Sequence, residues 1–225
     1  MVNIDIKARL ESIRSTLADG VTLVAVSKFH PLEALREAYD AGQRDFGESR
    51  VQELAAKAAA MPADVRWHFI GHLQTNKVRQ LLPSVYLIHS IDSLHLLQTV
   101  DREARRIGKT VDVLLQLHVA AEETKFGFSP DECARLVESG ALSSLANVRV
   151  RGLMAMATNT DNFAQVEAEF RRVCDLFNSL KAGPLCGNPE FSEISMGMSD
   201  DYPIAMRCGS TIVRIGSSIF GERQY

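Results

Sequence analysis

Short apolar runs alternate with segments of helical period along the whole chain. The first helical pattern has apolar residues at helix-like spacing, Ile4, Ile6, Leu10, Ile13 and Leu17, and it stops at Gly20. The run of β-branched and apolar residues at Thr22–Lys28 then predicts a buried strand. A helical pattern over 32–39 follows and ends before Gly42.

The same alternation continues to the end of the sequence. Seven further strands are predicted at Asp45–Ser49, Trp67–Gly71, Val85–Asp92, Thr110–Val119, Asn147–Thr158, Glu193–Ser199 and Thr211–Gly221. Further helices are predicted at Arg50–Ala60, Thr75–Leu82, Ser93–Ile107, from the capping box Ser129–Glu132 onward, at Asp161–Lys181 and at Asp201–Arg207. Each predicted strand except the last is therefore followed by a predicted helix.

This order of elements predicts an α/β fold with a parallel sheet. Strands that read as continuous apolar runs belong to sheets that are covered on both faces. Eight strand–helix units close most economically as a single (β/α)₈ TIM barrel over residues 1–225, here with one extra helix at the N-terminus. The alternative is an open doubly wound sheet, but no GxGxxG motif follows the first predicted strand.

Composition narrows the class of protein. Of 225 residues, 46% are hydrophobic, and 25 Lys and Arg against 28 Asp and Glu give a net charge of −3, which argues against a nucleic-acid-binding protein. The longest apolar run, Leu153–Ala157, is far too short to span a membrane, and Met1–Ala8 does not resemble a signal peptide. The four cysteines lie far apart without a CxxC motif, which predicts reduced thiols, no metal site and a cytoplasmic location.

In a barrel of this type, function is expected at the carboxyl ends of the strands. Lys28 ends a strand of four consecutive apolar residues. Partial burial there would favour the neutral amine, which attacks carbonyl groups. From position alone, a solvated lysine at a strand end explains the residue equally well.

Two segments near the C-terminus suggest a phosphate site. Ser195–Ser199 and Val213–Ser217 each place a glycine, Gly197 or Gly216, after an expected strand, and the loops after the last two strands of barrels often bind phosphate. Ser199 is predicted to cap the helix that follows, where an anion is favoured. Asp200 and Asp201 are expected to point to solvent or to help to start that helix. The alternative is that glycine and serine are simply common at strand ends.

Together, an amine nucleophile and a phosphate site in one barrel mouth suit either a Schiff-base aldolase or a pyridoxal phosphate protein. At these residues the sequence resembles the pyridoxal phosphate homeostasis protein family, whose barrel is similar to the N-terminal domain of alanine racemase. The matching segments are Val24–Lys28, Phe46–Glu48, Gln52–Glu53, Trp67–Gln74, Asn76–Lys77, Ser90–Asp92, Lys125–Gly127, Arg151–Met154, Ser195–Asp200, Val213–Gly216 and Ile219–Gly221.

The resemblance implies that this chain binds pyridoxal 5′-phosphate. It implies that Lys28 holds the cofactor as an internal aldimine and that Arg214 faces the pyridine nitrogen. A cation there disfavours protonation of that nitrogen and makes the ring a poorer electron sink. The remaining residues that the resemblance places at the cofactor are Ser199, Gly216 and Ser217 at the phosphate, and His72 and Ser49 at strand ends near the expected position of the cofactor.

The sequence also departs from the family pattern. Ser49 replaces a usual asparagine, Ser217 replaces a common threonine, and Met154–Thr158 replaces an ending with proline. None of these changes removes the lysine or the hydroxyl groups at the phosphate positions.

The resemblance further implies a carrier rather than a catalyst. The sequence stops at Tyr225, just after the eighth predicted strand, where alanine racemase adds a domain that supplies a second acid–base group. Racemisation needs groups on both faces of the substrate, and only Lys28 is evident here. The expected function is therefore intracellular homeostasis or carriage of pyridoxal phosphate by a monomer that passes the cofactor to apo-enzymes. The alternative is a weak pyridoxal phosphate-dependent amino-acid racemase or related enzyme.

Overall fold

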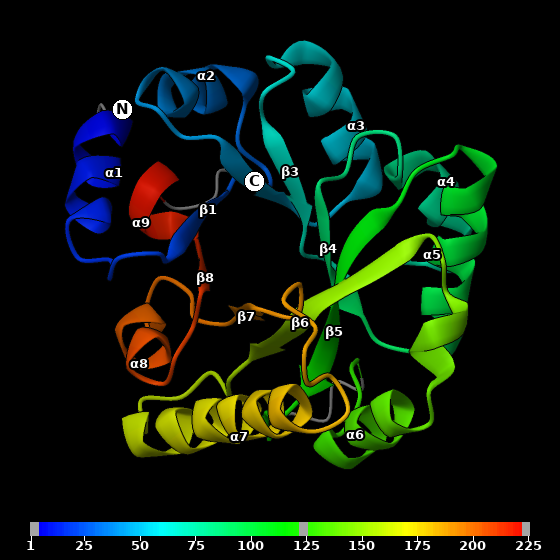
Figure 1. Cartoon of the computed structure of the whole chain (residues 1–225). Coiled ribbons are helices and arrows are strands. Elements are labelled where there is room, and N and C mark those ends of the chain that lie inside the picture. The colour runs from blue at the N-terminus through cyan, green and yellow to red at the C-terminus, as the bar shows by residue number, and fades with distance from the viewer. Residues whose placement is uncertain (1–4, 122–125, 222–225) are drawn as a thin grey trace.

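Eight parallel strands form a closed barrel in the order in which they occur in the chain (Figure 1). The computed structural model describes residues 5–121 and 126–221, so Ile4 and Lys125 lie outside the described residues. The strands are β1 (Thr22–Val26), β2 (Asp45–Glu48), β3 (Arg66–Phe69), β4 (Leu87–Ile91), β5 (Val111–His118), β6 (Val148–Met156), β7 (Glu193–Ser195) and β8 (Ile212–Ile215). Pairing of β1 with β8 closes the barrel, which confirms the predicted TIM barrel and excludes the open sheet.

Helices surround the barrel (Figure 1). They are α1 (Ile6–Arg14), α2 (Leu32–Asp40), α3 (Val51–Ala60), α4 (Val78–Leu81), α5 (Leu94–Arg106), α6 (Pro130–Glu138), α7 (Phe163–Ala182), α8 (Tyr202–Arg207) and α9 (Ser217–Phe220), with 3₁₀ turns η1 (Thr75–Lys77) and η2 (Ala141–Ser144). The extra N-terminal helix is present as α1, which packs against α2 and α9. The predicted capping box is also present, because the Ser129 hydroxyl accepts from the Glu132 N–H and the Glu132 carboxylate accepts from the Ser129 N–H.

The interior of the barrel is built in layers because alternate residues of a strand point to the same face. An apolar layer consists of a separate cluster of buried side chains: Val24, Leu87, Leu114, Met154 and Ile212. Two residues further along their strands, His89 follows Leu87 and Arg214 follows Ile212, and both are buried. The layer toward the carboxyl ends of the strands is therefore polar.

The last part of the chain differs from the prediction. The strand expected at Thr211–Gly221 ends at Ile215, and Ser217–Phe220 forms the short helix α9, so the eighth strand is also followed by a helix. Ile219 and Phe220 are buried on α9. A short apolar run does not distinguish a strand from a buried helical turn, which explains the error.

The segment after β7 also differs from the prediction. The strand expected at Glu193–Ser199 ends at Ser195, and Asp201, not Ser199, occupies the N-cap position of α8. The Asp201 carboxylate accepts a hydrogen bond from the Met198 N–H at 2.5 Å, which closes the loop before the helix. Ser199 is therefore left in the loop, where its hydroxyl can serve another partner.

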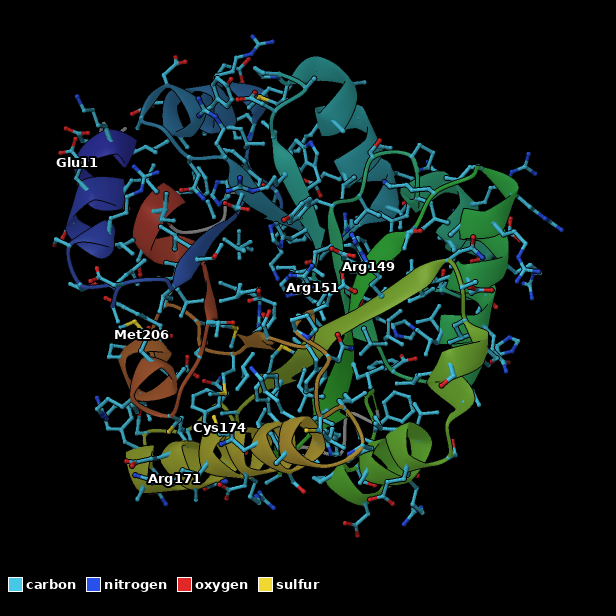
Figure 2. All side chains as sticks on the ribbon, viewed as in Figure 1. Glu11, Arg149, Arg151, Arg171, Cys174 and Met206 are labelled. Carbon is cyan, nitrogen blue, oxygen red and sulfur yellow. The ribbon has the colours of Figure 1, made fainter. Side chains whose placement is uncertain are left out.

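The helices and the buried cysteine thiols of the described residues have structural roles. Among these residues, no helix combines the length and apolar character needed to cross a bilayer. Burial raises the pKa of the Cys133 thiol to about 12, so the thiol stays protonated at neutral pH. Cys174 on α7 lies beside α8 (Figure 2) and donates its S–H to the carbonyl of Cys208. These thiols pack the helical layer.

Candidate functional site

Lys28 lies in a tight turn at the carboxyl end of β1. The side chain is half-buried, and the His30 N–H donates to the Ser27 carbonyl at 3.1 Å to close the turn. Phe29, the next residue, has φ 67° and is the one non-glycine residue with positive φ among the residues described. A side chain in that region is strained unless its surroundings hold it there. The turn that presents Lys28 is therefore held by contacts from outside.

Two side chains of α3 supply those contacts. Glu53 accepts a hydrogen bond from the Phe29 N–H at 2.8 Å. Lys57 donates from Nζ to the Ser27 carbonyl at 2.7 Å. Both backbone neighbours of Lys28 are thus tied to one helix, which fixes the direction in which Lys28 leaves the strand.

A buried ion cluster supports this arrangement. Lys57 Nζ lies 2.8 Å from Glu48 Oε1 and 2.7 Å from Glu53 Oε1, and the Ser27 hydroxyl donates to Glu48 Oε1 at 2.5 Å. Glu48 is completely buried, and this burial raises the pKa of its carboxyl against the opposing effect of Lys57. Lys57 is engaged by two carboxylates and a carbonyl, so it acts as the structural cation behind the Lys28 turn.

Aromatic contacts cover the outer side of the turn. The His30 ring stacks on Phe220 of α9 with ring centroids 4.9 Å apart. The Arg50 guanidinium lies 4.8 Å from the centre of the Phe29 ring. The short helix α9 therefore helps to seat the residues that follow Lys28.

Arg214 comes from β8, the neighbour of β1, and pairs in register with Val24. The side chain is 3% exposed and donates from Nη1 to the Ser195 hydroxyl at 2.7 Å and from Nη2 to the Ala155 carbonyl at 3.0 Å. Burial lowers the pKa of Arg214 to about 10, so the guanidinium remains a cation at neutral pH. Both of its partners are neutral.

The loops after β7 and β8 meet through two hydroxyl groups. The Ser217 hydroxyl donates to the Ser199 hydroxyl at 3.0 Å. Gly197 has φ 94°, and a Cβ there would lie 2.6 Å from the Ala205 Cβ, so this turn requires glycine. A Cβ on Gly216 would lie 3.2 Å from the Val26 carbonyl oxygen, which shows how closely β8 approaches the end of β1. The structure thus brings Ser199 and Ser217 together beside Gly216, and their role at a phosphate stays a prediction.

The structure places His72 and Ser49 in a neighbouring area. Both line a cavity of about 340 Å³ near the ends of β2 and β3. His72 Nδ1 lies 3.1 Å from Asp92 Oδ2, and its ring lies 4.0 Å from the ring of Phe126. These contacts join His72 to the loops after β4 and β5, so its assignment to the cofactor stays a prediction.

Sequence reasoning missed the role of Lys57. The pattern held a signal, because Lys57 continues the buried spacing of Val51 and Leu54 on α3. A lysine on the apolar face of a helix needs a buried carboxylate partner. The interior positions of His68 and His89 were equally hard to interpret, because each has its partners on other strands.

Known proteins match this chain in both sequence and fold. Residues 4–224 match the family model of the alanine racemase N-terminal domain. The pyridoxal phosphate homeostasis protein of Haemophilus influenzae is 38% identical over 208 residues, which cover 91% of this chain and 86% of that protein. The protein of the same name from Aquifex aeolicus is 41% identical over 204 residues, which cover 90% and 87%.

This chain belongs to the pyridoxal phosphate homeostasis protein family. The resemblance found in the sequence motifs is therefore confirmed. A solved member of the family, PipY of Synechococcus elongatus PCC7942 without PLP, is 39% identical, with a TM-score of 0.90 over 96% of this chain and 100% of that one. The same protein with PLP bound matches with a TM-score of 0.86 over the same shares.

Alanine racemase shares the barrel at lower similarity. The enzyme of Clostridium difficile is 14% identical, with a TM-score of 0.75 over 98% of this chain and 56% of that one. At this identity the likeness shows the fold alone.

Proposed function

We propose that this chain binds pyridoxal 5′-phosphate at the carboxyl end of the barrel through Lys28 and serves in homeostasis of that cofactor. The observation that carries the proposal is the clamped turn of Lys28 at the carboxyl end of β1, next to β8, the strand that holds the buried cation Arg214. The related PipY structure with PLP bound supports it at 39% identity.

The residues at this end of the barrel fit the chemical groups of the cofactor. Bound pyridoxal phosphate supplies an aldehyde that condenses with a primary amine and releases water. Lys28 offers that amine from a fixed turn. The hydroxyls of Ser199 and Ser217 and the closely approaching backbone at Gly216 suit the phosphate. Arg214 suits the pyridine nitrogen, because its charge is not matched by a carboxylate in direct contact among the described residues.

Arg214 also favours carriage over catalysis. A buried cation that faces the pyridine nitrogen keeps that nitrogen unprotonated and weakens the ring as an electron sink. We therefore propose binding and release of the cofactor with little turnover. Delivery to apo-enzymes, a monomeric state, and contacts from His72 and Ser49 stay predictions.

The test uses purified protein incubated with pyridoxal phosphate. Wild type is expected to gain a visible absorbance band, and borohydride reduction is expected to fix the cofactor on a peptide that contains Lys28. Lys28→Ala should lose both signals. Lys181→Ala, which changes an exposed lysine on α7, is the matched control and should keep both.

Some results would contradict this proposal, and another would favour an enzymatic function instead. Retention of the band in Lys28→Ala, or a label on another lysine, would contradict attachment at Lys28. Loss of α-deuterium from an amino acid in the presence of wild type, abolished by Lys28→Ala, would instead support the alternative of a weak racemase or related enzyme.

A further inference from the structure

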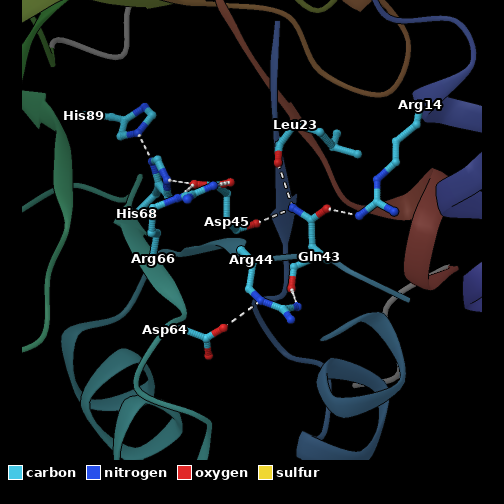
Figure 3. Close-up of polar contacts among 9 residues, drawn as sticks. All are labelled: Arg14, Leu23, Gln43, Arg44, Asp45, Asp64, Arg66, His68 and His89. Carbon is cyan, nitrogen blue, oxygen red and sulfur yellow. Dashed lines mark hydrogen bonds and ion pairs between the residues drawn. The ribbon is translucent and has the colours of Figure 1, made fainter. Parts of the chain in front are cut away.

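A continuous chain of hydrogen bonds runs through the barrel interior to Arg214. Asp45 accepts from Arg66 and lies 3.0 Å, Oδ1 to Nε2, from His68. His68 Nδ1 lies 2.8 Å from His89 Nε2, and His89 Nδ1 lies 2.9 Å from the hydroxyl oxygen of Ser195. Figure 3 shows the first part of this chain, from Arg66 to His89. Ser195 then accepts from Arg214, so the chain joins the two ends of the barrel.

The chain is sealed from solvent between its ends. Asp45 is 6% exposed, His68 is 1% exposed, and His89 and Ser195 are completely buried. They come from β2, β3, β4 and β7, so closure of the barrel is what brings them together. Because buried polar groups are hydrogen-bonded in folded proteins, each proton in this row is expected to have an acceptor within it.

The Asp45 carboxylate, at one end of this row of hydrogen bonds, determines in which direction each hydrogen bond donates its proton. Burial opposes ionisation of Asp45, but hydrogen bonds from Arg66 and His68 outweigh it and lower the pKa of the Asp45 carboxyl. An ionised carboxylate only accepts hydrogen bonds. His68 Nε2 must therefore carry a proton and donate it to Asp45.

The other end of the chain fixes the remaining protons. An arginine only donates, so Ser195 accepts from Arg214 and is left to donate its own hydroxyl proton to His89 Nδ1. Burial, with His68 and Arg214 nearby, holds the pKa of His89 well below its usual value, so its ring is neutral. Its single proton then lies on Nε2 and is donated to His68 Nδ1. In the opposite arrangement, the buried Ser195 hydroxyl proton would have no acceptor among the described residues.

We propose that Ser195 and His89 are positioning residues for Arg214, held by an ordered row of hydrogen bonds that ends on Asp45. With its proton committed to His89, Ser195 presents only a lone pair to Arg214. The Ala155 carbonyl supplies the second acceptor, and two acceptors fix the plane of a guanidinium that would otherwise sample several rotamers. The part of this inference that concerns the cofactor rests on the proposed function, whereas the proton arrangement does not.

The first experiment needs no cofactor. Long-range ¹H–¹⁵N correlation spectra of the imidazole rings of labelled protein distinguish the two tautomers. Both His68 and His89 are expected in the Nε2–H form. The groups that face the two rings are Asp45 of β2, Tyr86 before β4, Ser195 of β7 and Arg214 of β8. A proton on Nδ1 of either ring would overturn the proposal.

The second experiment measures how the bound cofactor responds. Ser195→Ala removes one acceptor of Arg214 and is expected to weaken pyridoxal phosphate binding about 10-fold and to shift the visible band. Ser195→Thr keeps the hydroxyl and should restore both. Ser210→Ala is the matched control, because it deletes another buried hydroxyl, which lies within hydrogen-bond distance of the Met196 and Ile212 carbonyls, and it should leave the band unchanged.

The outcomes separate this inference from the proposed function. If wild type binds and Lys28→Ala does not, but Ser195→Ala has the spectrum and affinity of wild type, the positioning role is wrong and the proposed function stands. If wild type fails to bind the cofactor, the proposed function is wrong, and the tautomers alone decide whether the ordered row exists. If Ser195→Thr does not fold, as judged from its thermal unfolding, the tautomer spectra of wild type remain decisive.

Discussion

The two ends of the barrel interior differ in how their charged side chains are paired. At the amino end, side chains of both signs surround a cavity of about 120 Å³: Asp45, Arg66, Asp112, Arg151 and Glu193. Arg149 and Arg151, both on β6 (Figure 2), lie 2.6 and 3.5 Å from the carboxylate of Asp112. At the carboxyl end, Arg214 contacts a hydroxyl and a carbonyl.

This difference suggests that the charged side chains at the amino end of the barrel serve stability, whereas Arg214 at the carboxyl end serves binding. Paired charges at the amino end satisfy each other, and the partly exposed pairs among them contribute little apart from holding the strand ends in register. Arg214 has neutral hydrogen-bond partners and interacts with the Asp201 carboxylate without a direct hydrogen bond, so its donors and charge can serve a ligand. In barrels, binding residues are expected at the carboxyl ends of strands, which agrees with this division.

The largest expected effect comes from exchanging an arginine for methionine at each end. Arg214→Met should weaken pyridoxal phosphate binding by about 30-fold, because a charged hydrogen bond to the ligand is lost. It should change the free energy of unfolding by less than about 1 kcal/mol, since relief of the buried charge offsets the two lost hydrogen bonds. Fluorescence or absorbance titration and urea unfolding measure the two quantities.

Arg151→Met is the matched change at the amino end. It should leave cofactor affinity within about 2-fold and lower the free energy of unfolding by about 1 kcal/mol, because Asp112 keeps Arg149 as a partner. Equal losses of affinity in the two variants would refute the division between the two ends.

A smaller effect, on the free energy of unfolding, is expected from Asp45→Asn, and its size depends on pH. The folded-state pKa of Asp45 is lowered, so its contribution to stability is present above the unfolded value of about 3.9 and is lost as pH falls through the folded value. At pH 7 the variant should be less stable by about 1–2 kcal/mol. The two proteins should converge in strongly acidic solution.

Urea unfolding of both proteins across this pH range measures the difference directly. Glu48 has a raised pKa, so its contribution has the opposite sign and is lost as pH rises, but it is common to both proteins and cancels. A difference that does not shrink in acid would mean that Asp45 is not ionised in the folded protein.

The smallest expected effect on affinity concerns Ser217, whose hydroxyl is hydrogen-bonded to Ser199. Ser217→Ala should weaken binding of pyridoxal phosphate about 5-fold, because one hydroxyl donor to the phosphate is lost. Binding of pyridoxal, which lacks the phosphate, should not change. Ser139→Ala, at the end of α6, is the control and should alter neither. Equal weakening for both ligands would place Ser217 away from the phosphate.

Much of the fold was predictable because it depends on local pattern. Apolar runs such as 22–28 and the capping box at Ser129 predict strands and helices from neighbouring residues alone. The strand expected through Gly221 was wrong because Ile219 and Phe220 are buried by a helical turn, and the partners of that turn are far away in the sequence.

The site was predictable only in part. Lys28, Ser199 and Ser217 were singled out by their positions near strand ends, and Arg214 by the resemblance to the family; their roles at the cofactor stay predictions. The contacts of Lys57 with Ser27 and Glu48 were not, because they join residues 30 and 9 positions apart through the packing of α3 on the barrel. The strain at Phe29 has no sequence signal at all, since no glycine marks the turn.

The amino-acid sequence by itself determined the eight strands, the helices between them, the barrel and the family, because hydrophobic periodicity and motif spacing are properties of short segments. Only the tertiary structure decided which polar groups meet inside the barrel. The row from Asp45 to Arg214 joins strands that are distant in the chain, and it forms because a closed barrel forces its inward side chains to find partners there.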